Sequence, residues 1–319
     1  MNRRIFLAGM LVMLLAGTAV AGTLSPNMEA YLADKADGAP VMALLMMNDR
    51  LDVKALDWEL HEAHTPLAER HYTVITSLQQ DAQRAQASLL ADLETMVRLG
   101  EIESYEPFWI VNGVFITAKD EMAIRDLALR ADVDVVEPPL SIELIEPETR
   151  MAPDKSADGI GITPGVVNVG ARRVWDELGI NGTGAIVCNL DTGVDGNHPA
   201  FASRWRGNYA PAEECWLDFV GGFNNPPVDS DMHGTHTMGT MCGVAAGDTI
   251  GVAPGALWIA ANTIVGGNLG NQVLQTMQWL ADPDGDPFTM DDVPDVANNS
   301  WGVNESFGYP DCYNAWWSA

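Results

Sequence analysis

Apolar and polar positions along the first half of the chain follow patterns typical of both strands and helices. Residues 41–47 form an unbroken apolar run of strand length. Residues 67–99 carry apolar side chains at helical spacing, and Gly100 offers a stop, which predicts one unusually long helix. The pattern after this helix predicts two strands, a helix and a final strand. Residues 110–117 are one of the two strands, the helix runs from a capping box at Thr117 to Asp120 up to about Leu129, and residues 133–137 are the final strand. The region predicts a small α/β sandwich, a fold that serves as a binding module, a regulatory domain or a pro-segment.

A stretch rich in Pro, Gly, Asp, Ser and Thr, residues 146–165, follows this region. Its composition predicts a linker that is exposed and easily cut. Beyond it, residues 185–190, 256–264 and 295–299 have patterns of buried strands, with helical patterns between them. This alternation is typical of an α/β domain with a largely parallel sheet.

Composition excludes several classes of protein. Apolar residues make up 47% of the 319 residues, enough for a core in each of two domains, so a disordered tail is excluded. The 17 basic residues against 44 acidic ones leave a formal charge of −27. A surface of that sign repels phosphates and anionic lipids, so nucleic acid is not an expected partner.

The N-terminus has the pattern of an export signal. Arg3 and Arg4 precede an apolar stretch at residues 5–16, and Ala19 and Ala21 are small residues at the two positions that a signal peptidase recognises. We therefore expect cleavage after Ala21 and a secreted or periplasmic protein. Because the apolar stretch is too short to cross a bilayer, we expect no membrane contact after signal removal. The paired arginines also resemble a twin-arginine signal, so both that route and the general secretory route stay open.

Four cysteines in an exported chain allow three disulfide pairings. Cys188 lies in an apolar strand pattern and Cys242 in a helical run of small residues, so both are predicted to be buried thiols. If one disulfide forms, we expect it to join Cys215 and Cys312.

The candidate chemistry lies where strands end. Asp191 follows an apolar strand, and functional side chains of open parallel sheets gather at the carboxyl ends of strands. His233 stands in a glycine-rich segment that predicts a helix start. A carboxylate that holds an imidazole in its proton-accepting tautomer is the orienting half of a nucleophilic triad. A metal pair of His233 and His236 is disfavoured because a zinc peptidase helix needs His-Glu-x-x-His, so we assign His236 and His198 structural roles.

These residues resemble a known family. Four segments look like the subtilases, of the bacillopeptidase F type: Asp-Thr-Gly at 191–193, His-Gly-Thr-His-Thr-Met-Gly at 233–239, Gly-Val-Ala-Pro-Gly-Ala at 251–256 and Asp-Val-Ala-Asn-Asn-Ser-Trp-Gly at 295–302. The resemblance implies that Asp191 is the orienting acid and His233 the general base. It also implies that Ser300, Trp301 and Gly302 form an edge strand that pairs with an extended protein or peptide substrate.

The resemblance further implies a domain organisation. Residues 1–21 would be the signal peptide, and residues 22–148 an α+β propeptide of ferredoxin-like fold that serves as an intramolecular chaperone and inhibitor. Residues 149–164 would be a linker with the maturation site, and we expect the cut between Glu146 and Gly165. Residues 165–319 would be a subtilisin-like three-layer α/β catalytic domain with a mostly parallel sheet.

The chain departs from the family pattern in two places. No serine stands in the Gly-Thr-Ser-Met-Ala context of the family's nucleophile, and no Ala-Gly-Asn turn supplies the side-chain oxyanion donor. We therefore expect these residues to be the N-terminal part of a serine endopeptidase zymogen, with a catalytic domain truncated before both groups and inactive as written. The alternative is a non-catalytic secreted binding protein or peptidase inhibitor.

The chemistry of this family requires no cofactor, but structural calcium is expected in many members. Asp282, Asp284 and Asp286 form an oxygen-rich loop that could bind calcium, although Pro287 stands where an EF-hand needs glycine. Many subtilases bind calcium through an Asp after His-Pro, and here that position is Ala200. We favour a solvated loop over a calcium site.

Overall fold

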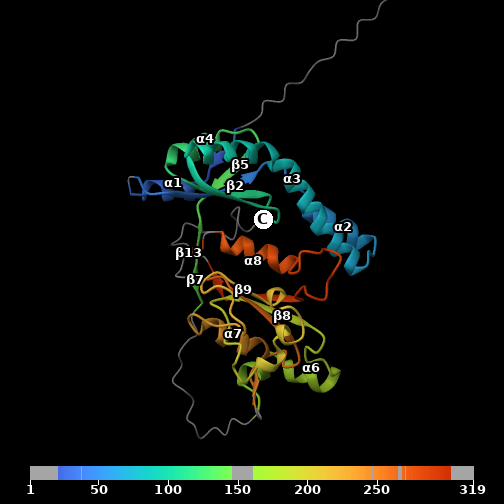
Figure 1. The fold of residues 1–319 in the computed structure, drawn as a ribbon. Coiled ribbons are helices and arrows are strands. Elements are labelled where there is room, and N and C mark those ends of the chain that lie inside the picture. Colours follow the sequence, from blue (N-terminus) through green and yellow to red (C-terminus); the bar gives the residue numbers. More distant parts are fainter. Residues whose placement is uncertain are drawn as a thin grey trace, which may run out of the picture.

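The structure is a computed structural model that describes residues 21–36, 38–145, 161–245, 248–264, 268–269 and 271–302. The predicted signal sequence up to residue 20, including both arginines, and the linker up to residue 160 lie outside the described residues. Two α/β bodies lie one above the other in Figure 1. We call residues 21–145 the N-terminal domain and residues 161–302 the C-terminal domain.

The N-terminal domain is a five-stranded sheet in the order β1-β5-β2-β4-β3. Its strands are β1 (Thr23–Leu24), β2 (Val41–Met47), β3 (Ile102–Phe108), β4 (Gly113–Ala118) and β5 (Val133–Glu137), and its helices are α1 (Pro26–Ala33), α2 (Val53–Glu62), α3 (Leu67–Leu99) and α4 (Glu121–Ala128). Without the edge strand β1, the strand and helix order is the ferredoxin-like arrangement that the resemblance implied. Helices α1 and α2 were not predicted from the sequence.

Both faces of β2 are largely buried, which explains the unbroken apolar run of this strand. Val41 and Leu45 face α3 and α4 in one core, whereas Leu44 and Met46 face the opposite side. There they pack with Leu274 of the C-terminal domain, whose helix lies beneath the sheet in Figure 1. The strand therefore has no polar face, because apolar side chains cover most of both of its faces.

Local signals set the ends of the helices. Helix α3 ends at Leu99, and Gly100 follows in the left-handed conformation with φ of 76°, as the sequence predicted. The capping box at Thr117 was wrong because Thr117 lies inside β4. Asp120 caps α4 instead, where its carboxylate accepts hydrogen bonds from the backbone N–H groups of Met122 and Ala123.

The C-terminal domain contains a four-stranded parallel sheet in the order β14-β8-β12-β9, which confirms the predicted parallel sheet. These strands are β8 (Ile186–Asp191), β9 (Trp216–Asp218), β12 (Leu257–Asn262) and β14 (Val296–Asn298). The helices are α5 (Pro164–Asn168), α6 (Ala171–Leu178), α7 (His233–Cys242) and α8 (Gln272–Ala281), with three short 3-10 turns at Ala202–Arg204, Arg206–Asn208 and Ala212–Glu214. A small hairpin joins β10 (Val244–Ala245) and β11 (Asp248–Thr249).

A single segment after β5 runs from the N-terminal domain onto the C-terminal domain (Figure 1). Its two short strands are β6 (Leu140–Ser141) and β7 (Glu143–Leu144). They pair antiparallel with β13 (Asn268–Leu269) and β15 (Trp301–Gly302) of the C-terminal domain. We call residues 140–145 the connecting strand.

The cysteines that the structure describes are free thiols. Cys188 and Cys242 are buried, as the sequence predicted. The expected disulfide between Cys215 and Cys312 is not supported, because Cys215 is a buried free thiol whose sulfur lies 3.3 Å from a guanidinium nitrogen of Arg206. Cys312 lies outside the described residues. Within the described ranges, no helix is long and apolar enough to cross a membrane.

The long helix α3 offers a matched test of the N-terminal core. Leu93 is 0% exposed and packs against the sheet, whereas Leu99 in the same helix is 68% exposed. We expect Leu93→Ala to lower the free energy of unfolding by about 2–5 kcal/mol, because it leaves a cavity. Leu99→Ala should change it by less than about 0.5 kcal/mol. Urea unfolding followed by circular dichroism measures both, and equal losses would contradict this packing.

Candidate active site

Asp191 is the last residue of β8, at the carboxyl end of a central strand of the parallel sheet. Its side chain is completely buried. One carboxylate oxygen accepts a hydrogen bond of 2.7 Å from the N–H of Thr192 and lies 2.6 Å from Nδ1 of His233. The other accepts a hydrogen bond of 3.2 Å from the hydroxyl of Thr237. The structure thus brings together the two residues that the sequence predicted as acid and base.

His233 opens helix α7, as predicted. Met232 before it has φ of 78°, so the chain turns sharply and the imidazole projects from the first turn. Gly234 lets the helix approach the strand end, because a Cβ there would collide with the carbonyl oxygen of Gly193. The buried imidazole therefore owes its position to close backbone contact between α7 and the end of β8.

Asp229 is a part of the site that the sequence analysis missed. One of its oxygens accepts a hydrogen bond of 2.8 Å from the hydroxyl of Thr192, and the other accepts bonds from both the N–H and the hydroxyl of Thr235. Thr192 follows Asp191, and Thr235 lies in the first turn of α7. Asp229 thus ties the strand end to the helix start. The available signal was an acidic residue shortly before a predicted helix, where the helix dipole favours negative charge.

The electrostatics of the pair suit a proton transfer. Burial raises the pKa of Asp191 above its ordinary value of 3.8, and its hydrogen bonds to His233 and Thr192 oppose that rise. When the imidazole donates from Nδ1 to this carboxylate, Nε2 is left as the acceptor that can take a proton from a hydroxyl. Nε2 lies 3.1 Å from the carbonyl oxygen of Ile145 in the connecting strand. Because a carbonyl oxygen can only accept, Nε2 carries the proton in this contact, and His233 can accept a proton there only once that carbonyl has moved away.

The predicted substrate strand is paired with the chain itself. Strand β15 lies antiparallel to β7, with Trp301 opposite Leu144 and Gly302 opposite Glu143. The N–H of Ile145 also donates a hydrogen bond of 3.0 Å to the carbonyl oxygen of Ser300. Ser300, Trp301 and Gly302 thus contact an extended backbone segment that ends beside His233, which is the arrangement expected of a peptide-binding edge strand.

The aspartates predicted as calcium candidates lie in the loop after α8. Asp284 accepts hydrogen bonds from the N–H of Asp286 and the hydroxyl of Thr289, so its carboxylate organises the loop. Burial and the neighbouring carboxylates raise the pKa of Asp282 to about 6. In the part of the chain that the structure describes, no group of three or more His, Cys, Asp or Glu side chains is arranged to hold a metal ion. Calcium binding therefore stays a prediction.

The fold and site define a class: an α/β domain in which a buried aspartate at a strand end contacts a histidine beside a strand that pairs with an extended backbone segment. Residues 182–316 match the model of the subtilase family. Residues 182–316 therefore form a subtilase domain. The sequence-based prediction of the family and of its α/β, subtilisin-like fold is therefore confirmed.

Individual relatives share a third or less of their residues with this chain where they align. Bacillopeptidase F of Bacillus subtilis is 33% identical over 284 residues, which are 83% of this chain and 20% of that protein. The subtilisin-like protease PopC of Myxococcus xanthus is 33% identical over 162 residues, 44% of this chain and 30% of PopC. The solved structure of fervidolysin from Fervidobacterium pennivorans matches with a TM-score of 0.46 and 19% identity, covering 89% of this chain and 38% of that one. The chain thus spans less than a third of the length of these two curated relatives.

The raised pKa of Asp191 predicts a conflict between stability and activity. Because the pKa of Asp191 is higher in the folded protein than in the unfolded chain, ionisation of Asp191 lowers the free energy of unfolding. This loss grows as the pH rises above about 3.8, is complete above the folded pKa, and is absent below about 3.8. We expect Asp191→Asn to raise the melting temperature at pH 7 and to have little effect near pH 3.5. Asp231→Asn, at an exposed carboxylate in the loop before α7, is the control and should change neither value. A lower melting temperature for Asp191→Asn at pH 7 would contradict the burial cost.

Proposed function

We propose that this protein is a secreted serine endopeptidase made as a zymogen, in which Asp191 and His233 are two members of the catalytic triad. The observation that carries the proposal is the buried Asp191–His233 pair, whose Nε2 faces the backbone of a strand bound along Ser300–Gly302. Protein and peptide segments in extended conformation are the proposed substrates. The apolar N-terminal stretch supports export, by either of the two routes described above.

The proposed chemistry follows from the geometry of the pair. A serine hydroxyl placed at Nε2 would lose its proton to His233 as its oxygen attacks a peptide carbonyl, and Asp191 would stabilise the imidazolium that forms. None of the serines in residues 1–319 stands in the family's nucleophile context. We therefore propose that the serine and the side-chain oxyanion donor come from residues outside these 319. No cofactor is needed for this reaction, and calcium would serve only a structural role.

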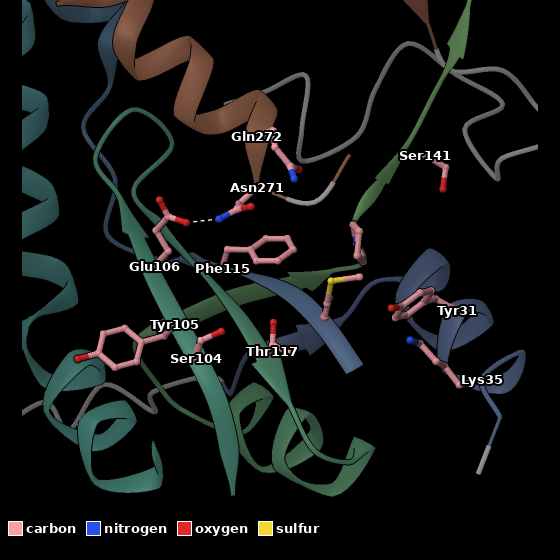
Figure 2. Close-up of a pocket in the computed structure, with 12 residues that line it drawn as sticks. Tyr31, Lys35, Ser104, Tyr105, Glu106, Phe115, Thr117, Ser141, Asn271 and Gln272 are labelled. Carbon is pink, nitrogen blue, oxygen red and sulfur yellow. Dashed lines mark hydrogen bonds between the residues drawn. The ribbon is translucent and has the colours of Figure 1, made fainter. Parts of the chain in front are cut away.

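The N-terminal domain is proposed to act as the inhibitor of this site. Its sheet covers α8 of the C-terminal domain, where Leu274 enters the apolar face of the sheet. Figure 2 shows Glu106 of β3 turned toward Asn271 at the start of α8, and the same carboxylate accepts a hydrogen bond of 2.6 Å from Gln275. The N–H of Trp109 donates a hydrogen bond of 2.7 Å to the side chain of Gln278. These contacts join the N-terminal domain to α8, and the connecting strand pairs with β15, so substrates would be excluded from that strand until the N-terminal domain leaves.

Removing the proposed base tests the activity. In the protein expressed from its complete gene, we expect His233→Ala to lower peptide hydrolysis by about 10⁴-fold or more, because proton transfer from the serine is lost. His61→Ala, at an exposed histidine of α2, is the matched control and should leave the rate unchanged. Hydrolysis of a casein substrate, with and without a serine-directed phosphonate reagent, measures the rate. Full activity in the His233 variant would exclude this mechanism.

Substitution of Glu106, which contacts α8, tests whether the N-terminal domain inhibits the site. Glu106→Ala removes two hydrogen bonds to a charged acceptor, which should speed dissociation of the N-terminal domain roughly ten- to hundredfold. We expect a shorter lag before activity appears during maturation. Glu103→Ala, at an exposed glutamate of the same strand, is the control. An unchanged lag for Glu106→Ala would show that this contact does not contribute to inhibition.

A further inference from the structure

A cavity of about 600 Å³ lies between the N-terminal domain and the start of α8 (Figure 2). Strands β2, β3 and β4 supply part of its lining, and residues of α1 and of the turn after α1 lie at one end. Asn271 and Gln272 line it from the C-terminal domain. Asp191, His233 and strand β15 are not among the described residues that line it, so it is separate from the candidate active site. Small-molecule sites have volumes of about 300–1,000 Å³, and this cavity falls within that range.

Two polar atoms on the lining of this cavity have no partner in the protein. They are the hydroxyl of Tyr31 and the side-chain carbonyl oxygen Oε1 of Gln272, each buried without a hydrogen bond. Figure 2 shows both side chains turned toward the cavity. A buried polar atom that stays unpaired lowers the stability of a folded protein. Two such atoms on the lining of one cavity indicate that a ligand completes their hydrogen bonds.

Charges of opposite sign lie at the two ends of the cavity. At one end, the ammonium nitrogen of Lys35 is 4.8 Å from the ring centroid of Tyr31 and donates a hydrogen bond to the carbonyl oxygen of Pro40. An ammonium group has three donors, so two are left for a ligand. At the other end, Glu106 binds residues at the start of α8, and its carboxylate retains acceptor sites. Figure 2 shows Phe115 between Glu106 and Tyr31, so an apolar surface separates the two charges.

We propose that the cavity binds a short zwitterionic peptide with an apolar side chain, of about the size of a dipeptide. The peptide carboxylate accepts hydrogen bonds from Lys35 and from the hydroxyl of Tyr31. The peptide ammonium group donates to Oε1 of Gln272, beside the carboxylate of Glu106. The apolar side chain packs against Phe115.

The chemistry of the two ends selects this class of ligand. A side-chain amide oxygen only accepts hydrogen bonds, so a ligand must bring a donor to Gln272. A lysine only donates, so the same ligand must bring an acceptor to Lys35. A simple anion leaves Gln272 unpaired and lies near the carboxylate of Glu106, and a simple cation is repelled by Lys35. A zwitterion matches both ends at once.

The peptide binds the two domains together, because the lining of the cavity comes from both. A ligand that binds only the joined domains stabilises them in proportion to its concentration relative to its Kd. Short peptides are the products of the proteolysis proposed above. The accumulated products therefore delay release of the N-terminal domain. This delay rests on the proposed function, whereas the binding does not.

Calorimetric titration tests the binding. The sample is the protein expressed from its complete gene with His233→Ala, which keeps both domains on one chain. The probes are the dipeptide Leu-Leu, its N-acetyl derivative and its C-terminal amide. We expect Leu-Leu to bind, and each capped form to bind at least about tenfold more weakly, because it lacks one hydrogen-bonded charge. No binding of Leu-Leu at millimolar concentration, or equal binding of the three probes, would overturn the proposal.

Substitution of Tyr31 tests the location of the site. We expect Tyr31→Phe to weaken Leu-Leu binding about tenfold, because it removes a donor to the peptide carboxylate. The melting temperature without peptide should not fall, since this hydroxyl makes no hydrogen bond within the protein. The matched control is Tyr209→Phe, at an exposed tyrosine of the C-terminal domain, which should bind Leu-Leu normally. Unchanged affinity in Tyr31→Phe would show that the peptide binds elsewhere and would overturn the site.

The lag before activity tests the delay. In the unsubstituted protein expressed from its complete gene, Leu-Leu at ten times its Kd should lengthen the lag before casein hydrolysis about tenfold, since only the peptide-free form releases its N-terminal domain. Leu-Leu added to the mature enzyme is the control and should leave casein hydrolysis unchanged. An unchanged lag would overturn the delay. Absence of casein hydrolysis at all times would overturn the proposed function instead, while calorimetry still reported on the binding.

Discussion

The hydrogen bond of 2.6 Å between Asp191 and His233 is the interaction on which the site depends. It requires a carboxylate at the end of a buried strand, where loss of hydration disfavours its charge. Donors from Thr192, Thr237 and His233 offset that cost. Gly234 then permits the close backbone approach that brings the imidazole within reach. Asp191 and His233 are 42 positions apart in the sequence, and they meet because β8 and α7 pack against each other.

A second constraint joins the two domains. The sheet of the N-terminal domain has two apolar faces, and the chain covers one with α3 and α4 and the other with α8. The connecting strand leaves the same sheet, pairs with β15 and ends beside His233.

Features with local signals were predictable from the sequence, and features that depend on distant contacts were not. Helix α3 and its stop at Gly100 follow from periodicity and from the freedom of glycine to adopt positive φ. Asp191 and His233 were found because their motifs are short and local. The role of Asp229 was missed because it acts only when two segments meet in space. The cap of α4 was misplaced because Thr117 and Asp120 are both good caps, and pairing of β4 decided between them.

Hydrogen exchange at the backbone amide of Ile145 tests the central claim most directly, namely that the connecting strand pairs with Ser300–Gly302 and ends beside His233. That amide donates to the carbonyl oxygen of Ser300, so its exchange should be slowed to the level of other paired strands. We predict protection at Ile145 comparable to that of β8 and β12 in the same sample. Exchange of the Ile145 amide at the rate of an unstructured peptide, while β8 and β12 stay protected, would contradict the account.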